Sequence, residues 1–177
     1  MRRAARVFSA LILLAVLVMG AALIYQRPPA RPELPVLVGQ IDRIVIDKSA
    51  RRMVLMQDGK TVRIYQIALG FSPVGDKSRQ GDGRTPEGVY RINRRNRGSA
   101  YHLSLGLDYP QAADIAAARR GGYNPGGDIM IHGQPNRFPD AAVIKGDWTA
   151  GCIAVSNAEI REIFAATAMG TEVEVRP

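Results

Sequence analysis

The sequence predicts a mainly β domain with a few peripheral helices. The first half of this domain consists of short runs rich in Ile, Val, Leu and Met, which are separated by polar or Gly-containing turns. Its last residues, 171–176, alternate between apolar and polar side chains as a half-buried strand does. Only two segments, 111–120 and 156–170, carry helix signals, so strands dominate the expected fold.

Three antiparallel strands are expected at the start of the domain. Residues 41–47 and 52–57 are β-type runs joined by the polar stretch 48–51. A third strand over 61–69 follows Asp58-Gly59, a dipeptide typical of hairpin turns. Further strands are expected over 88–93, over 128–132 and over 171–176. The strand over 128–132 ends at His132.

The two helices are expected outside the sheet. Residues 111–120 are alanine-rich, follow a proline and stop at Gly121-Gly122. The second helix begins at Ser156, which forms a capping-box pattern with Glu159. Apolar residues then recur on one face, and Gly170 is predicted to cap the helix C-terminus.

The N-terminus predicts an exported protein. Residues 1–6 are basic, and an apolar run over 7–24 follows, so we assign 1–25 to a membrane anchor or a signal peptide. The length of the run favours the anchor, while Gly20-Ala21-Ala22 keeps a cleaved signal open. Residues 26–38 are a Pro-rich linker, and 39–177 form one domain. The basic head predicts that this domain lies in the periplasm or on the cell-envelope face and that the N-terminus anchors it in the inner membrane.

The charge and composition of the chain limit the classes of partner and cofactor that we expect. The formal charge of +8 is spread along the chain, with local clusters at 48–52 and 91–97, and favours anionic surfaces in general. We expect no nucleic-acid partner, because export and the lack of a groove-reading or stacking motif argue against one. We also expect no metal or other cofactor, since one Cys and two His without carboxylates at ligand spacing make a poor zinc site.

Cys152 is the only cysteine of the chain, and it follows His132 by twenty positions. An unpaired cysteine in an exported protein indicates an intermolecular disulfide, a buried small hydrophobe or a reactive thiol. A neighbouring imidazole that takes the thiol proton would supply the thiolate that attacks a carbonyl. Cys152 and His132 are therefore candidates for acyl transfer, and the amides of Gly151 and Cys152 are candidates for binding the oxyanion.

Four motifs occur in a fixed order along the domain. Two of them are Ile131-His132-Gly133 and Thr149-Ala150-Gly151-Cys152. The other two lie upstream, at Ala68-Leu69-Gly70 with Lys77 and at residues 81–90. In order and spacing these motifs resemble the L,D-transpeptidase (YkuD-like) catalytic domain family, from about residue 40 to residue 176. The resemblance implies a YkuD-like β-sandwich or barrel, so 39–177 is expected to be the catalytic domain.

The resemblance also implies roles. Cys152 would be acylated by a peptidoglycan stem peptide, His132 would act as general base and acid, and the Gly133 carbonyl would orient the imidazole. The partners implied are donor and acceptor stem peptides. Ala150 and Ala154 replace polar residues that are common in the family, and residues 147–154 look like its YafK-like branch. Transfer to an amine and hydrolysis at a diaminopimelate linkage both stay open, and we expect appreciable hydrolysis because the alanines position an amine poorly.

Other residues have weaker signals. His102, Trp148 and Thr149 are candidate substrate contacts, although a lone histidine in an apolar stretch is more often structural. Lys77 and Arg79 are candidates for binding stem-peptide carboxylates, with a solvated loop charge as the alternative. Asp82 and Arg84 are expected to fix their loop. The function classes that remain beside a cell-wall acyltransferase are a non-catalytic wall-binding module and a tethered structural protein linked through Cys152.

Overall fold

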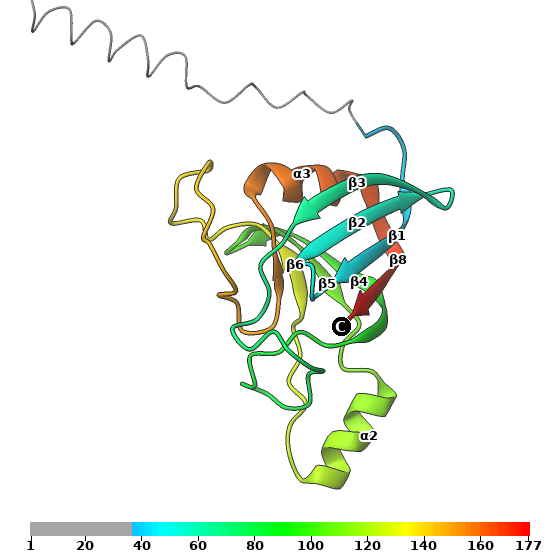
Figure 1. Cartoon of the computed structure of the whole chain (residues 1–177), viewed down its shortest axis with the longest axis vertical. Helices are drawn as coiled ribbons and strands as arrows, with labels where there is room; N and C mark the ends of the chain where they lie inside the picture. Colours follow the sequence, from blue (N-terminus) through cyan, green and yellow to red (C-terminus); the bar gives the residue numbers. More distant parts are fainter. Residues whose placement is uncertain (1–36) are drawn as a thin grey trace, which may run out of the picture. The chain divides into compact units, whose positions relative to one another are not determined.

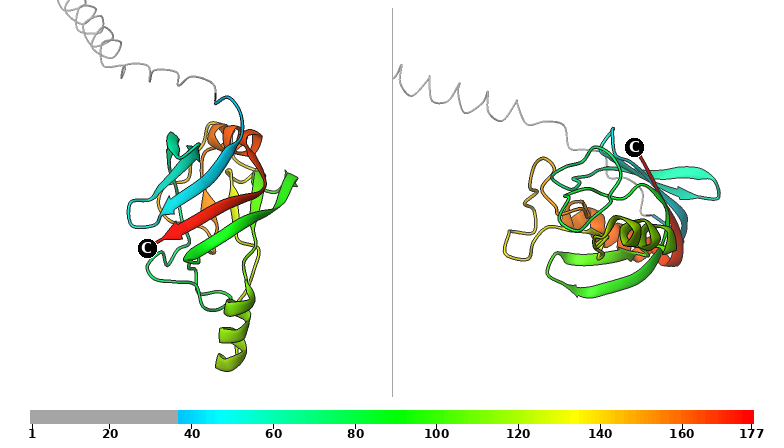
Figure 2. Two further views of the ribbon diagram at one scale, coloured as in Figure 1. Left: turned by 90° about the vertical axis from the view of Figure 1, so that its right-hand side faces the viewer. Right: turned by 90° about the horizontal axis from the view of Figure 1, so that it is seen from below.

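The computed structural model describes residues 37–177, and they form an eight-stranded, strongly bent sheet with two helices. The strand order is β3-β2-β1-β8-β4-β5-β6-β7. Figure 2 shows the bend, with β1 to β3 on one side of the half-barrel and β4 and β5 on the other. The predicted class, mainly β with peripheral helices, is confirmed.

The front of the domain follows the expected hairpins. β1 (Ile41–Asp47) and β2 (Arg52–Gln57) have the predicted bounds, and β2 pairs antiparallel with both β1 and β3. β3 (Lys60–Gln66) is shorter than the expected strand over 61–69. The reason is that the chain leaves β2 after Gln66, and Ala68 exchanges backbone hydrogen bonds with Ala154 instead.

The second half of the sheet was only partly predicted. β4 (Gly88–Ser99) runs six residues beyond the expected 88–93, because its exposed Arg-rich end pairs with β5 (His102–Leu107). β5 itself was missed, as was the two-residue β7 (Ile153–Ala154). β6 (Met130–His132) is a shorter form of the expected strand over 128–132 and ends at His132 as predicted.

Both helices form, with different ends from those expected. α2 (Ala112–Gly121) projects from the end of the domain opposite α3, as Figure 1 shows. α3 (Asn157–Ala166) starts at the predicted capping box, in which Ser156 accepts from the Glu159 N–H. The predicted C-cap at Gly170 is wrong. The helix ends at Ala166, and Gly170, with φ +81°, lies inside β8 (Thr167–Arg176).

The core lies between the bent sheet and α3, which packs on β5. Ile44 and Met53 from the front strands, Ile131 and Ile153 from the site strands, and Ile160 from α3 are all fully buried. Each such side chain contributes about 1.5–3 kcal/mol on burial. β6 and β7 are thus anchored by apolar side chains next to the residues that carry the candidate chemistry.

A buried lysine ties the front strands to the long loop 71–87. Lys48 is 2% exposed, and its Nζ donates to the carbonyls of Gly75 and Thr85 and to the Glu87 carboxylate, at 2.7, 2.9 and 2.7 Å. In the sequence this residue stood out only as part of the charge cluster over 48–52. A buried ammonium needs such a full set of acceptors, because an unpaired buried charge is strongly unfavourable.

Residues 1–36, which hold the expected anchor or signal and most of the expected linker, lie outside the described residues. Within residues 37–177, no helix has the length and hydrophobicity that are needed to cross a bilayer.

Replacing Lys48 with Met should lower the free energy of unfolding by about 2–4 kcal/mol, because Glu87 and the carbonyls of Gly75 and Thr85 lose their donor. Urea denaturation monitored by circular dichroism measures this. The matched control is Lys60→Met at the exposed start of β3, where a change within about 0.5 kcal/mol is expected. Equal effects of the two substitutions would contradict the role of Lys48.

Candidate active site

The sheet brings Cys152 and His132 into one cleft. β6 and β7 pair in parallel, with Ile131 opposite Ile153 and His132 opposite Ala154. Cys152 immediately precedes β7, so it lies beside Met130 at the start of β6. Both side chains line a cleft of about 500 Å³, together with Tyr101, Trp148 and Asp128. This volume is in the range of ligand sites.

A backbone carbonyl sets the tautomer of His132. The His132 Nδ1 lies 2.7 Å from the Gly133 carbonyl oxygen, which can only accept a hydrogen bond. Nδ1 therefore carries the proton in the neutral ring, and Nε2 keeps its lone pair. Gly133 has no room for a side chain, since a Cβ there would lie 2.6 Å from Asn157 Oδ1. His132 thus has the tautomer that a general base requires.

Two aromatic rings enclose the imidazole. The Tyr101 ring lies 4.6 Å from the His132 ring and the Trp148 ring lies 5.7 Å from it, measured between centroids. Burial lowers the pKa of His132, although the hydrogen bond to Gly133 acts in the opposite direction. The imidazole is therefore neutral at pH 7.

The thiol of Cys152 is also neutral at rest. Burial raises its pKa above the ordinary value, the nearby Asp128 carboxylate adds to this, and a backbone hydrogen bond from Met130 and the charge of Lys77 oppose it. The Sγ lies 3.4 Å from the Asp128 carbonyl oxygen, to which the thiol proton is donated. The resting pair is thus a thiol and an imidazole rather than an ion pair.

The turn before Cys152 is held by Thr149. The Thr149 Oγ1 donates to the Cys152 carbonyl at 2.7 Å and accepts from the Gly151 N–H at 3.1 Å. Gly151 has φ +138°, and a Cβ there would lie 2.6 Å from the Arg84 carbonyl oxygen. The Gly151 N–H is already used, whereas the Cys152 N–H has no acceptor within residues 37–177 and is the available one of the two expected oxyanion donors.

The segment that carries Trp148 and Thr149 is fixed from the front of the sheet. Arg51 Nε donates to both carboxylate oxygens of Asp147, at 3.1 and 2.9 Å. Asp147 also accepts from the Leu69 N–H at 2.9 Å, and Thr149 exchanges backbone hydrogen bonds with Leu69 and Phe71. The site loop is therefore held at several points before any substrate binds.

The three expected substrate contacts lie in different places. Trp148 forms a wall of the cleft, and its buried Nε1–H has no hydrogen-bond partner among residues 37–177. Thr149 is 4% exposed and supports the turn. His102 does not line the cleft. Its Nε2 accepts from Arg161, which in turn pairs with the Asp140 carboxylate, so its environment is that of a structural histidine.

A second cavity, of about 330 Å³, adjoins Cys152. It shares Asp128, Ala150 and Cys152 with the first, and Lys77 and Gln80 lie on its other side. Lys77 is 6% exposed and donates to Asp82 Oδ1 at 2.8 Å, so the alternative of a solvated loop charge is wrong for it. Cys152 therefore has a cavity on each side.

Sequence reasoning missed Tyr101 and Asp128. Tyr101 precedes His102, in a hairpin that the sequence did not reveal because the polar end of β4 concealed it. Asp128 has φ +54° just before β6, and its carboxylate pairs with Arg94 at 2.6 Å. Among residues 37–177, no group of three or more His, Cys, Asp or Glu side chains is arranged to hold a metal ion.

Comparison with known proteins identifies the family. The model of the YkuD family, L,D-transpeptidase catalytic domain, matches residues 41–175. YafK of Escherichia coli (strain K12), an L,D-transpeptidase by name, is 34% identical over 102 residues, which are 56% of this chain and 35% of that protein. The chain thus spans about a third of the curated relative. This chain belongs to the L,D-transpeptidase catalytic domain family.

Solved structures share the fold. The helical cell shape determining protein Pgp2 from Campylobacter jejuni is 26% identical, with a TM-score of 0.59 over 78% of this chain and 48% of that one. The L,D-transpeptidase (residues 123–326) from Xylanimonas cellulosilytica is 18% identical, with a TM-score of 0.54 over 89% of this chain and 68% of that one. The second likeness concerns the fold alone.

The neutral resting pair predicts how Cys152 alkylation depends on pH. The thiolate is the nucleophile, and the pKa of the thiol is raised above its ordinary value of 9.0. The rate with iodoacetamide should therefore rise about tenfold per pH unit from pH 6 to pH 9, and His132→Ala should leave this slope unchanged. A plateau near neutral pH that His132→Ala removes would reveal a thiolate–imidazolium pair instead.

Proposed function

We propose that this chain is a cysteine L,D-transpeptidase that acts on peptidoglycan stem peptides through a Cys152 thioester. The observation that carries the proposal is the shared cleft of Cys152 and His132, with His132 Nε2 unprotonated through the contact of Nδ1 with Gly133. Membership of the family supports the reaction class and the wall-peptide substrate.

The reaction begins from the neutral pair. As the sulfur attacks the peptide carbonyl, the thiol proton moves to His132 Nε2 and an S–C bond forms. The Cys152 N–H stabilises the oxyanion. Collapse breaks the C–N bond, and His132 returns the proton to the departing amine. The thioester is then attacked by an acceptor amine, with His132 again removing a proton and the thiol as leaving group.

The two cavities beside Cys152 suit a donor and an acceptor. The 500 Å³ cleft and the 330 Å³ cavity meet at Cys152, Ala150 and Asp128, so one peptide on each side reaches the same sulfur. Water remains a competing acceptor. Ala154 is 1% exposed and lines neither cavity, so the argument for hydrolysis rests on Ala150 alone, which offers an amine no polar contact.

The cell envelope is the compartment that fits the proposed substrate. The basic and apolar N-terminal residues support a periplasmic domain, held at the inner membrane by residues 1–25 and spaced from it by a linker over 26–38. Two relatives support a wall enzyme of this kind, one named an L,D-transpeptidase and the other a cell shape determining protein.

Substitutions of the candidate pair test the mechanism. Cys152→Ala should abolish formation of both product and thioester, and His132→Ala should slow acylation by about a hundredfold or more. His102→Ala is the matched control, because His102 lies outside the cleft and contacts Arg161 instead. Mass analysis of muropeptides and of the intact protein measures product and adduct. Normal turnover in Cys152→Ala, or equal losses in the two histidine variants, would overturn the assignment.

The fate of the thioester gives a second prediction. With a labelled tetrapeptide donor and a series of diaminopimelate-type amine concentrations, hydrolysed product should exceed transferred product when the amine is scarce. Ala150→Asn adds a polar group between the two cavities and should shift the ratio toward transfer. Dominance of transfer at every amine concentration in the unmodified protein would contradict the role given to Ala150.

A further inference from the structure

A third cavity lies in the loop 71–87, on the far side of Gln80 and Gly81 from Cys152. Its volume is about 320 Å³, and Ser72, Ser78, Arg79 and Arg84 contribute side chains to its wall. Gln80 and Gly81 line both this cavity and the 330 Å³ cavity that contains Cys152. The third cavity therefore adjoins the cavity next to the candidate nucleophile, with Gln80 and Gly81 at their common border.

The charges around this cavity leave two guanidinium groups without a carboxylate. Asp82 is the acidic residue of the wall, but Lys77 Nζ donates to it at 2.8 Å and neutralises it. Neither Arg79 nor Arg84 forms a salt bridge within residues 37–177. Arg84 donates to the Asp76 carbonyl at 3.2 Å, and the Arg79 guanidinium lies 5.8 Å from the centroid of the Tyr123 ring.

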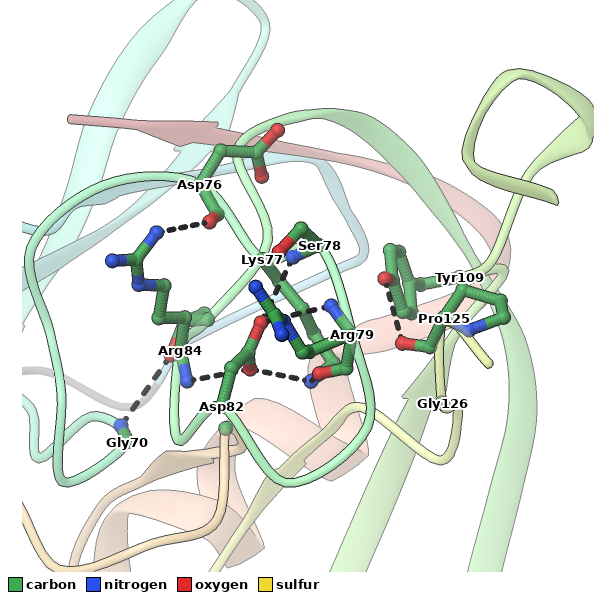
Figure 3. Close-up of polar contacts among 12 residues, drawn as sticks. Gly70, Asp76, Lys77, Ser78, Arg79, Asp82, Arg84, Tyr109, Pro125 and Gly126 are labelled. Atoms are coloured by element: carbon green, nitrogen blue, oxygen red, sulfur yellow. Dashed lines mark hydrogen bonds and ion pairs between the residues drawn. The ribbon is translucent and has the colours of Figure 1, made fainter. Parts of the chain in front are cut away.

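The frame that presents these groups is built before any ligand binds. Asp82 accepts from the backbone N–H groups of Ser78, Arg79 and Arg84, at 2.9, 3.0 and 3.1 Å, as Figure 3 shows. Burial alone would raise the pKa of Asp82, but these contacts and the bond from Lys77 lower it to about 2. Asp82 thus stays ionised and holds the loop closed at neutral pH.

Two hydroxyl groups complete the set of donors. Ser72 uses its backbone N–H to bond the Gly83 carbonyl, and Ser78 uses its N–H on Asp82. Neither serine hydroxyl has a hydrogen-bond partner within residues 37–177. Two guanidinium groups without a carboxylate partner and two free hydroxyls around one small cavity match a carboxylate, which accepts several charge-assisted hydrogen bonds at once.

We propose that Arg79 and Arg84 bind a free carboxylate of the peptide whose carbonyl is attacked by Cys152. This proposal rests on the proposed function, because the peptide must extend from Cys152 past Gln80 and Gly81 into the third cavity. Stem peptides carry free carboxylates as well as the amide bonds at which they are cleaved. The pocket therefore selects donors by a charge that lies away from the reacting bond.

Binding to the full chain carrying Cys152→Ala tests the proposal without turnover. Calorimetry at low salt compares a wall tetrapeptide with analogues in which each free carboxylate in turn is a carboxamide. Arg84→Gln and Arg79→Gln should each weaken binding of the tetrapeptide about tenfold, the loss expected for one charge-assisted contact. The analogue that lacks the carboxylate bound by the two arginines should bind weakly to the Cys152→Ala protein, and adding either arginine substitution should not weaken its binding further.

The control is Arg120→Gln, which removes the same charge from the exposed last turn of α2 and should leave the affinity unchanged. Arg79 is exposed and donates no hydrogen bond from its side chain within residues 37–177, so its variant is expected to fold even if Arg84→Gln does not. Unchanged binding in Arg79→Gln, equal losses for every analogue, or no binding of any peptide would overturn the proposal. Failure of the proposed function would appear separately, as absent turnover by the unmodified protein.

Discussion

The site depends on the parallel pairing of β6 with the two-residue strand β7. Val155 donates to the His132 carbonyl at 3.0 Å, and Ala154 at the end of β7 lies opposite His132 at the end of β6. On its other side, Ala154 exchanges hydrogen bonds of 2.9 and 2.8 Å with Ala68. A strand this short is held only because both of its edges are paired and Ile153 is fully buried. A shift of one residue in this register would turn Cys152 away from the cleft.

The burial of His132 and Cys152 next to this strand pair determines the protonation states of the imidazole and the thiol. Removing water from the imidazole and the thiol disfavours both charged forms, so the pKa of His132 falls and that of Cys152 rises. An ion pair at rest would need a contact strong enough to offset both desolvation costs. In the proposed mechanism the proton moves only as the sulfur attacks, and the Gly133 carbonyl stabilises the ring as it becomes charged.

Local signals in the sequence predicted the local parts of the fold. β1, β2 and the capping box at Ser156 follow from side-chain periodicity and from contacts within four residues, and all three are confirmed. Elements that depend on distant pairing were missed, or their bounds were wrong. β7 is defined by β6 and by Ala68, while β8 replaces the last helical turn because its first residues join the sheet rather than the helix.

The candidate site shows the same division. The cysteine, the histidine and their adjacent glycines were visible as motifs, because His132-Gly133 and Gly151-Cys152 are each contiguous in the chain. Tyr101 against His132, the hydrogen-bond partners of Lys48, and the place of His102 beside Arg161 depend on segments far apart in the chain. Charge patterning did not indicate that Lys48 or Lys77 is buried, since a sequence does not reveal which carbonyls and carboxylates surround an ammonium.

The central claim, a neutral His132 with its proton on Nδ1, is tested most directly by nitrogen-15 NMR of the histidine rings at pH 7. The chain has two histidines, so a His102→Gln variant assigns the signals. The account predicts a protonated Nδ1 and an unprotonated Nε2 for His132, unchanged in Cys152→Ala. A doubly protonated ring that becomes neutral in Cys152→Ala would contradict it, because this would show a resting thiolate–imidazolium pair.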